Sequence, residues 1–253
     1  MGLKTYIINL EKSVVRKQYM QELLSEYKFL DVEFVKAIDG RLLSEDERRA
    51  RFDYVRCKDL YGRTLNAGEV GCALSHRKAY SELLKSDCQY ALILEDDISI
   101  IRDLSSLDLA AIDELLTVQA PRALMLSGDY WYYKKKGIVK LFTASGAYAY
   151  IINRAAASRI LAIDPPCCVA DDWTFYKRNG LKLFAVNPYM IDANMKMDLL
   201  SSDVMQDSWT IDRSNMSKKE VLIGGLVGII KRAFKLCHHF ESKVRVIDNV
   251  IVD

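Results

Sequence analysis

The chain has 253 residues, of which 50% are hydrophobic and 28% charged. This balance predicts an ordinary globular protein, either one large α/β domain or a domain with a small appendage. The formal net charge of +2 is too small to indicate nucleic acid as a partner, so any basic function must be local.

The N-terminus and the cysteines bear on the compartment. The first residues pass straight into an apolar segment that is too short for a signal peptide and lacks a cleavage site, so we expect a cytoplasmic chain. Gly2 raises the question of myristoylation, but that motif requires Ser or Thr where this chain has Tyr6. The 6 cysteines show neither CxxC spacing nor disulfide-scaffold density, which predicts small apolar roles for most of them and no zinc site.

The first predicted strand, residues 4–10, leads into a helix for which Ser13 is a good N-cap. Asn9, Ser13 and Arg16 then cluster around one strand-to-helix turn. A helix N-terminus and a guanidinium at such a turn can bind phosphate or a nucleotide. The alternative interpretation is a capped helix with solvated charges.

A second strand, residues 32–35, runs into the segment from Ala37 to Gly40, where Asp-Gly marks a tight turn. Asp39 at this position can hydrogen-bond a ribose or a base, although a turn Asp more often only makes the turn. Residues 42–52 are predicted to be helical, followed by an irregular segment through Asn66.

A helix is predicted from Gly68 to about Lys85, with glycines at its entry and an apolar stripe along one face. The glycines allow close backbone approach to a ligand and leave the first-turn amides free to meet an anion. His76 lies on the flank of the stripe, where it either packs or contacts a diphosphate or substrate.

An apolar strand that ends in three acids follows this helix. Residues 91–94 are uninterrupted aliphatics, which suit a strand buried on both faces, and Glu95, Asp96 and Asp97 come directly after it. Ligands of open α/β sheets bind beyond the carboxyl ends of the strands, so these carboxylates are placed to hold a divalent cation. The alternative is a strand that runs into a polar turn.

The middle of the chain alternates between helix and strand. Residues 104–118 are predicted to form an amphipathic helix and residues 123–128 another buried strand, which favours a doubly wound α/β architecture. Residues 129–133 are predicted to be an aromatic loop that either stacks on sugar rings or packs as a corner.

A second acid pair follows a strand at residues 147–152 and a helix that Asn153 can cap. Asp171 and Asp172 stand beside Trp173, and a carboxylate in such a pair can act as a general base toward a hydroxyl. The alternative is a helix N-terminus, where the dipole favours acids. Residues 183–186 form the last predicted strand.

The C-terminal part has a different composition. Residues 192–217 are polar and predict a linker or surface excursion. Val221 to Ile230 carries no charge but is too short to cross a bilayer. Basic residues interleaved with apolar ones then predict an amphipathic segment on an anionic membrane surface. The alternatives are a helix docked on the domain or used for self-association. The basic residues are Lys231, Arg232, Lys235, Lys243 and Arg245.

Four blocks in this order together resemble glycosyltransferase family 25 of bacterial lipooligosaccharide biosynthesis. The blocks are Ile8 to Leu10 with Ser13 and Arg16, Ala37 to Gly40, Gly68 to His76, and Leu92 to Asp97. A weaker similarity at residues 147–156 and 169–173 extends the resemblance to about Pro188, and the basic tail lies outside it. The family often has an arginine before the serine and paired arginines later, so Arg16 is a better match than Lys17.

The resemblance implies a GT-A-like catalytic domain over residues 1–190, a Rossmann-like mixed or parallel sheet flanked by helices. A polar linker at 191–217 and a helical basic tail at 218–253 would follow. The implied activity is inverting, metal-assisted transfer of galactose from UDP-galactose, in β linkage, to a lipooligosaccharide or lipopolysaccharide core acceptor. The acceptor would be lipid-linked, and the protein peripheral at the inner face of the bacterial inner membrane.

The resemblance also implies roles for site residues. Mn²⁺ or Mg²⁺ would be held by Asp97, with Glu95 or Asp96 in support. Asp171 or Asp172 would be the base that deprotonates the acceptor hydroxyl, and chain position favours Asp171 as the hypothesis. The UDP-sugar would be bound by Asn9, Ser13, Arg16, Ala37, Asp39, Gly40, Ser75, His76 and Asp96.

Two alternatives to a glycosyltransferase function stay open. They are a metal-dependent nucleotidyltransferase and a noncatalytic glycan-binding or assembly protein.

Overall fold

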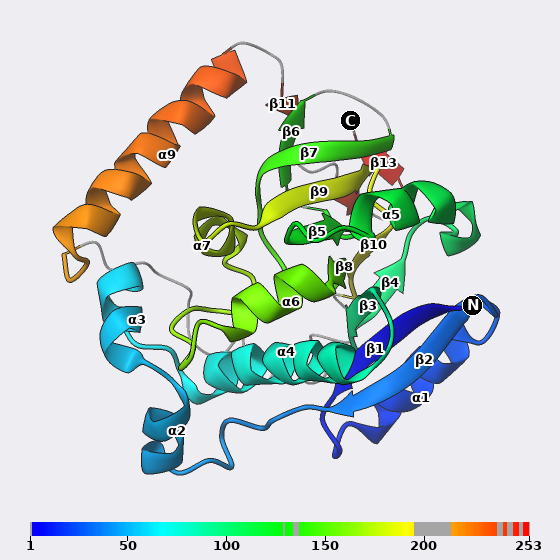
Figure 1. The fold of residues 1–253 in the computed structure, drawn as a ribbon, viewed down its shortest axis with the longest axis horizontal. Helices are drawn as coiled ribbons and strands as arrows, with labels where there is room; N and C mark the ends of the chain where they lie inside the picture. The colour runs from blue at the N-terminus through cyan, green and yellow to red at the C-terminus, as the bar shows by residue number, and fades with distance from the viewer. Residues whose placement is uncertain are drawn as a thin grey trace.

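The computed structural model describes residues 2–128, 130–133, 137–194, 214–236, 240–241, 245–247 and 250–252. Within these residues, nine strands form the main sheet, in the order β11-β6-β7-β9-β5-β8-β3-β1-β2 (Figure 1). The strands of this sheet are β1 (Leu3–Asn9), β2 (Leu30–Lys36), β3 (Tyr90–Glu95), β5 (Arg122–Met125), β6 (Tyr130–Tyr133), β7 (Gly137–Ala144), β8 (Ala149–Asn153), β9 (Lys182–Asn187) and β11 (Phe240–Glu241).

Helices and short strand pairs complete the described fold. The helices are α1 (Val14–Leu24), α2 (Glu45–Arg51), α3 (Tyr54–Tyr61), α4 (Ala67–Lys85), α5 (Leu109–Leu116), α6 (Arg154–Leu161), α7 (Trp173–Arg178), α9 (Lys218–Leu236) and the 3₁₀ turn Leu104–Ser106. The pairs are β4 (Ile98–Ile100) with β10 (Ile191–Ala193), and β12 (Arg245–Ile247) with β13 (Val250–Val252).

The sheet is parallel on one side and mixed on the other. β1 pairs in parallel with β2 and β3, so the carboxyl ends of these three strands share one edge. β8 then runs antiparallel between β3 and β5, and β9 is parallel to β5. This mixed α/β sheet flanked by helices confirms the predicted GT-A-like class, with the shared edge as the natural ligand side.

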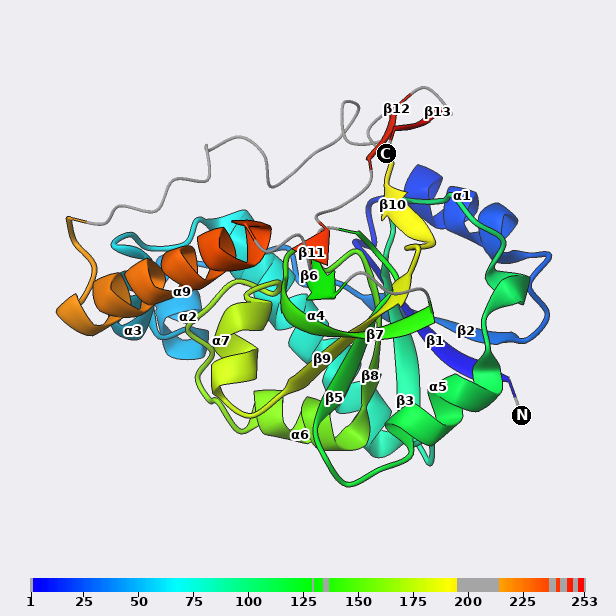
Figure 2. The same cartoon turned by 90° about the horizontal axis from the view of Figure 1, so that it is seen from above.

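Helices cover both faces of the sheet because its central strands are apolar on both faces. Ile93 packs into a core beneath α4 and α6, whereas Leu92 and Leu94 pack into a second core beneath α1 and α5 (Figure 2). All residues from Ala91 to Leu94 are 0% exposed, so the predicted buried strand is confirmed. Because the side chains of β3 alternate between the two cores, the strand ends between the two helix layers, and Asp96 and Asp97 follow at the edge of the sheet.

Three local predictions were wrong. The segment expected to be irregular contains α3, which Asp53 caps by accepting from Arg56 N. The expected long helix at 104–118 is split, because Asp108 caps a new start by accepting from Ala111 N. The expected aromatic loop is β6, which pairs with β7 as a hairpin. Asp129 lies outside the described residues.

The C-terminal part begins inside the fold. β10 pairs with β4, so the chain continues in the body of the domain just past residue 190. Most of the predicted linker, residues 195–213, lies outside the described part. Ser217 N donates to Asp59 O at 3.2 Å, and Arg178 pairs with Glu220 at 2.8 Å, so the start of α9 is docked near α3 and α7 (Figure 1). Among the described helices, none has the length and apolar character to cross a membrane.

Two glycines let the turn after β2 lie against the start of α4. A Cβ at Gly40 would lie 1.8 Å from the carbonyl oxygen of Ala67, and one at Gly71 would lie 2.6 Å from the amide nitrogen of Gly40. Only glycine leaves room for this approach of backbone to backbone. The glycines of these two sequence blocks therefore bring the turn and the helix together.

We expect Gly40→Ala to lower the free energy of unfolding by about 1–3 kcal/mol, because the added methyl group meets backbone that cannot move aside. Urea unfolding measures the change. Gly224→Ala is the matched control, since a Cβ at Gly224 has nothing within 4 Å. Equal unfolding free energies for Gly40→Ala and the control would contradict the packing argument.

Candidate functional site

The acids after β3 meet the strand-to-helix turn after β1. Asn9 Nδ2 donates a hydrogen bond to Asp96 Oδ2 at 2.6 Å, and Arg16 Nη1 donates to Asp96 Oδ1 at 2.9 Å. The same Arg16 nitrogen lies 2.8 Å from Asp97 Oδ2. Two sequence blocks about 80 residues apart therefore form one bonded cluster at the sheet edge.

Asp96 is the buried member of the acidic triplet. Burial raises the pKa of its carboxyl group, while the hydrogen bonds from Arg16 and Asn9 oppose that rise. The side chains of Glu95 and Asp97 are more accessible, at 25% and 17% exposed. Asp96 therefore holds the cluster together, and Glu95 and Asp97 are the acids that a ligand can reach.

The turn after β2 lies beside this cluster. Ala37 N donates to Asn9 O at 2.8 Å, which joins the turn to the end of β1. Asp39 pairs with Arg41 at 2.9 Å and with Lys12 at 2.8 Å. The hydrogen bond from Arg41 is the main cause of the pKa of Asp39 lying well below its usual value. Asp39 is thus an ionised acceptor held between two cations.

Two serines support the same edge through hydrogen bonds within the protein. Ser75 Oγ donates to Gly71 O at 2.6 Å and accepts from Ile38 N at 2.8 Å. Ser13 precedes α1 as predicted, but its side chain makes no capping hydrogen bond. Its carbonyl accepts from Asn9 Nδ2 at 3.2 Å. The predicted nucleotide-side residues are thus neighbours, and their contacts with a nucleotide stay predictions.

His76 links the acidic strand end to the core. It is 1% exposed, its Nε2 lies 3.1 Å from Glu95 Oε1, and its Nδ1 lies 2.7 Å from the Tyr150 hydroxyl. The Tyr150 hydroxyl in turn lies 2.6 Å from that of Tyr80. Both ring nitrogens therefore have protein partners, and the imidazole orients the Glu95 carboxylate.

The second acid pair divides into two different environments. Asp172 caps α7, with Oδ1 accepting from Phe175 N at 2.8 Å and Oδ2 accepting from the Tyr61 hydroxyl at 2.8 Å. Asp171 Oδ2 accepts from Gly146 N at 3.0 Å. The helix-terminus interpretation therefore holds for Asp172, which caps the start of α7, whereas the general-base role of Asp171 stays a prediction.

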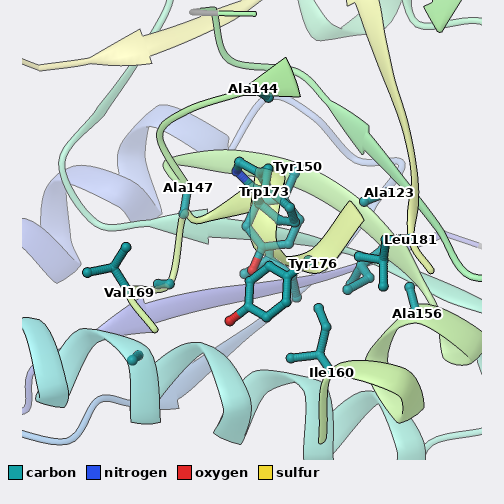
Figure 3. Packing of buried hydrophobic residues seen from close by; sticks show 14 of the residues in the cluster. Ala123, Ala144, Ala147, Tyr150, Ala156, Ile160, Val169, Trp173, Tyr176 and Leu181 are labelled. Carbon is teal, nitrogen blue, oxygen red and sulfur yellow. The ribbon is translucent and has the colours of Figure 1, made fainter. Parts of the chain in front are cut away.

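The loop between β7 and β8 brings Asp171 to the acidic strand end. Gly146 N donates to Asp171, Gly146 O accepts from Trp173 Nε1 at 2.8 Å, and Tyr148 O accepts from Glu95 N at 2.9 Å. Trp173 also packs edge-on against Tyr150, with ring centroids 4.8 Å apart (Figure 3). Burial raises the pKa of Asp171, and the charge of Glu95 adds to that rise. The two acidic segments therefore share one site.

The sequence interpretation did not assign Cys72 to this site. The ligand atoms of Cys72, His76 and Glu95 all lie within 4.8 Å of one another. Burial, followed by the charges of Glu95, Asp171 and Asp97, raises the pKa of the Cys72 thiol well above its usual value. The four-residue spacing of Cys72 and His76, which places both on one helix face, was the available signal.

Gly146 and Tyr61 were also missed. Gly146 adopts a left-handed backbone with φ of +76° and supplies the amide that binds Asp171. Tyr61 lies in α3, inside a segment predicted to be irregular, yet it binds Asp172 from 111 residues away in the chain. No local pattern marks either contact, since each depends on how distant segments pack.

The mixed sheet, its flanking helices and the carboxylates gathered beyond its strand ends define a GT-A-like α/β domain. A family model described as glycosyltransferase family 25 (LPS biosynthesis protein) matches residues 3–174. The chain belongs to glycosyltransferase family 25. This membership confirms the predicted resemblance and supports a glycosyltransferase function.

Three of the proteins to which this chain is similar come from animals. Procollagen galactosyltransferase 2 from Homo sapiens is 23% identical over 214 residues, which cover 74% of this chain and 34% of that protein. A glycosyltransferase 25 family member from Aedes aegypti is 38% identical over 96 residues, 37% of this chain and 16% of that protein. The probable inactive glycosyltransferase 25 family member 3 from Bos taurus is 27% identical over 173 residues, 64% of this chain and 29% of that protein. This chain thus spans about a third or less of these relatives.

Proposed function

We propose that the chain transfers galactose from UDP-galactose, in β linkage and with inversion, to a lipid-linked lipooligosaccharide or lipopolysaccharide core acceptor. The observation that carries the proposal is the convergence of two acidic segments at one sheet edge in a family 25 chain. The galactose donor is supported by relatives named procollagen galactosyltransferase. The lipopolysaccharide acceptor is supported by the description of the family model.

The nucleotide side of the donor would lie at the turns after β1 and β2. Arg16 supplies a guanidinium at a strand-to-helix turn, and this cation can contact phosphate while it holds Asp96 and Asp97. Asp39 supplies an ionised acceptor for a ribose or base hydrogen. The joined turns would thus offer a phosphate contact and a sugar contact at the same edge of the sheet.

The accessible acids of the triplet fit a divalent cation. Glu95 and Asp97 present carboxylate oxygens, which are the ligands that Mn²⁺ and Mg²⁺ prefer. After burial, the charges of both carboxylates also contribute to the raised pKa of the Cys72 thiol. Such an ion, when bound, would neutralise charge on the departing diphosphate. Asp96 is committed to Asn9 and Arg16, so Asp97 with Glu95 is the favoured pair.

Asp171 is the favoured base for the acceptor hydroxyl. Its carboxylate is held by one backbone amide, and burial raises its pKa toward the range in which a carboxylate accepts a proton efficiently. Asp172 has both oxygens bound, one by a helix amide and one by Tyr61. An inverting transfer needs one such base, and Asp171 is better placed for it.

We expect a screen of UDP-sugars with a lipooligosaccharide core acceptor to give UDP and a lengthened glycan, with the highest rate for UDP-galactose. Chelation should abolish the reaction, and Mn²⁺ or Mg²⁺ should restore it. Pyrophosphate release would show a nucleotidyltransferase instead. Neither UDP binding nor hydrolysis of any UDP-sugar, with Mn²⁺ present, would favour a noncatalytic glycan-binding protein.

We expect Asp171→Asn to lower the rate of transfer by more than about a hundredfold, the lower scale of acid/base contributions, while UDP-galactose binding is retained. The amide oxygen of Asn still accepts from Gly146 N, so the local structure is kept. Calorimetric titration and initial rates measure the two effects.

The matched control is Asp172→Asn, which keeps one oxygen to cap α7. We expect it to lower the free energy of unfolding, since the charged acceptor of the Tyr61 hydrogen bond is lost. Its turnover should stay within about tenfold of the parent protein, below the usual acid/base contribution. A rate loss in Asp172→Asn alone would move the base assignment to Asp172.

A peripheral position at the cytoplasmic face of an anionic membrane is part of the proposal. In α9, the apolar residues Leu222, Leu226 and Ile229 are 67%, 52% and 64% exposed. They recur at helical spacing and form one apolar stripe. Lys218 and Lys219 are exposed at the same helix. The side chains of the more distal basic residues lie outside the described part. An exposed apolar stripe near cations suits a membrane surface.

We expect simultaneous substitution of Leu222, Leu226 and Ile229 by serine to lower binding to phosphatidylglycerol vesicles by more than about tenfold. A fully buried leucine contributes about 1.5–3 kcal/mol, so partial insertion of three apolar side chains accounts for the loss. Vesicle flotation measures it. The control is Leu42→Ser, which removes a leucine that is 82% exposed on the body of the domain. Unchanged binding of the triple variant would reject membrane contact through α9.

A further inference from the structure

The thiol, imidazole and carboxylate next to the acidic strand end form a compact ligand set. Cys72 and His76 lie one turn apart on α4, and Glu95 ends β3. Their ligand atoms lie within 4.8 Å of one another. We propose that Cys72, His76 and Glu95 bind a thiophilic divalent cation of the Zn²⁺ class. This site goes beyond the proposed function, because it needs no sugar donor.

The donor atoms decide the class of ion. Sulfur, nitrogen and oxygen ligands together are typical of Zn²⁺, whereas Mg²⁺ and Ca²⁺ take oxygen ligands almost exclusively. Three protein ligands also leave the fourth position of a tetrahedral ion open. Bond lengths of about 2.0–2.3 Å place ligand atoms about 3.5 Å apart, so modest side-chain movements close the set around an ion.

The position of the histidine supports binding through Nε2. In metal sites, the ring nitrogen that does not bind the ion usually makes a hydrogen bond that fixes the ring. His76 Nδ1 has such a partner in the Tyr150 hydroxyl at 2.7 Å, and Tyr80 extends the network at 2.6 Å. Nε2 is the nitrogen that faces Glu95. The ring is therefore already oriented for an ion between the helix and the strand end.

Negative charge around the thiol favours a cation there. Glu95, Asp171 and Asp97 all act electrostatically on Cys72. A bound cation would offset the mutual repulsion of these carboxylates. Glu95 is also the supporting ligand of the proposed Mn²⁺ or Mg²⁺ site. A thiophilic ion would therefore compete with the donor's ion for one carboxylate, which makes the cluster a place where Zn²⁺ can inhibit transfer.

Titration of the purified full chain with Co²⁺ alone tests the proposal. We expect a thiolate-to-cobalt charge-transfer band in the near ultraviolet that saturates at one equivalent and disappears when Zn²⁺ is added. Cys72→Ser should lack the band, and Cys88→Ser should keep it. Cys88 is a matched control because it is also half-buried but lies near the opposite end of α4, just before β3.

Two further measurements keep the test independent of any folding defect in Cys72→Ser. In the unmodified chain, Zn²⁺ should slow alkylation of Cys72 but not of Cys88, as mapped by mass spectrometry. Tyr150→Phe should weaken Zn²⁺ binding by about 10–100-fold, the usual effect of removing the hydrogen-bond partner of a ligating histidine. Circular dichroism confirms that each variant is folded.

Absence of the band from the unmodified chain, an equal band in folded Cys72→Ser, or alkylation of Cys72 that Zn²⁺ does not slow would each overturn the proposal. The readouts report ion binding alone. The site therefore stands or falls separately from galactosyl transfer.

Discussion

The buried carboxylate of Asp96 is the constraint on which the rest of the site depends. It accepts from Asn9 at the end of β1 and from Arg16 in the first turn of α1, and it follows directly on β3. A buried charge is tolerated only when it is paired and hydrogen-bonded, so this carboxylate holds the ends of two strands and the start of a helix in one arrangement. The same guanidinium reaches Asp97, which ties the accessible acid to the buried one.

In both acidic segments, neighbouring acids have different partners. Asp96 is buried and hydrogen-bonded within the protein, while Asp97 stays accessible. Asp172 caps a helix, whereas Asp171 does not, and burial together with the charge of Glu95 raises the pKa of Asp171. In each pair one carboxylate is held by groups that build the fold, which fixes the backbone that presents the other. The roles proposed for Asp97 and Asp171 follow from this difference in partners between adjacent acids.

Local pattern accounts for much of the fold. The apolar run before the acids predicts a buried strand, and Asn153 predicts the start of a helix that it caps by accepting from Ala156 N. The same logic failed where contacts across the chain decide the structure. The β6–β7 hairpin, the left-handed Gly146 and the bond from Tyr61 to Asp172 all depend on packing between distant segments. The sequence could therefore predict that the two acidic segments belong to a site. The contacts of the loop that joins them could be found only from the structure.

The absence of CxxC spacing predicted no zinc site, whereas the ion site that we propose uses ligands that such spacing does not detect. Spacing rules detect ligands that lie close in sequence, but a site can equally draw a pair from one helix turn and a third ligand from a strand end. Cys72 and His76 supply the pair, and β3 brings Glu95 to them because its carboxyl end lies alongside α4 at the edge of the sheet. Glu95 is thus shared between the soft ligand set that we propose and the proposed pair with the harder Asp97. In the two proposals, a thiophilic cation bound by Glu95 would leave Asp97 without its supporting ligand for the donor's Mn²⁺ or Mg²⁺.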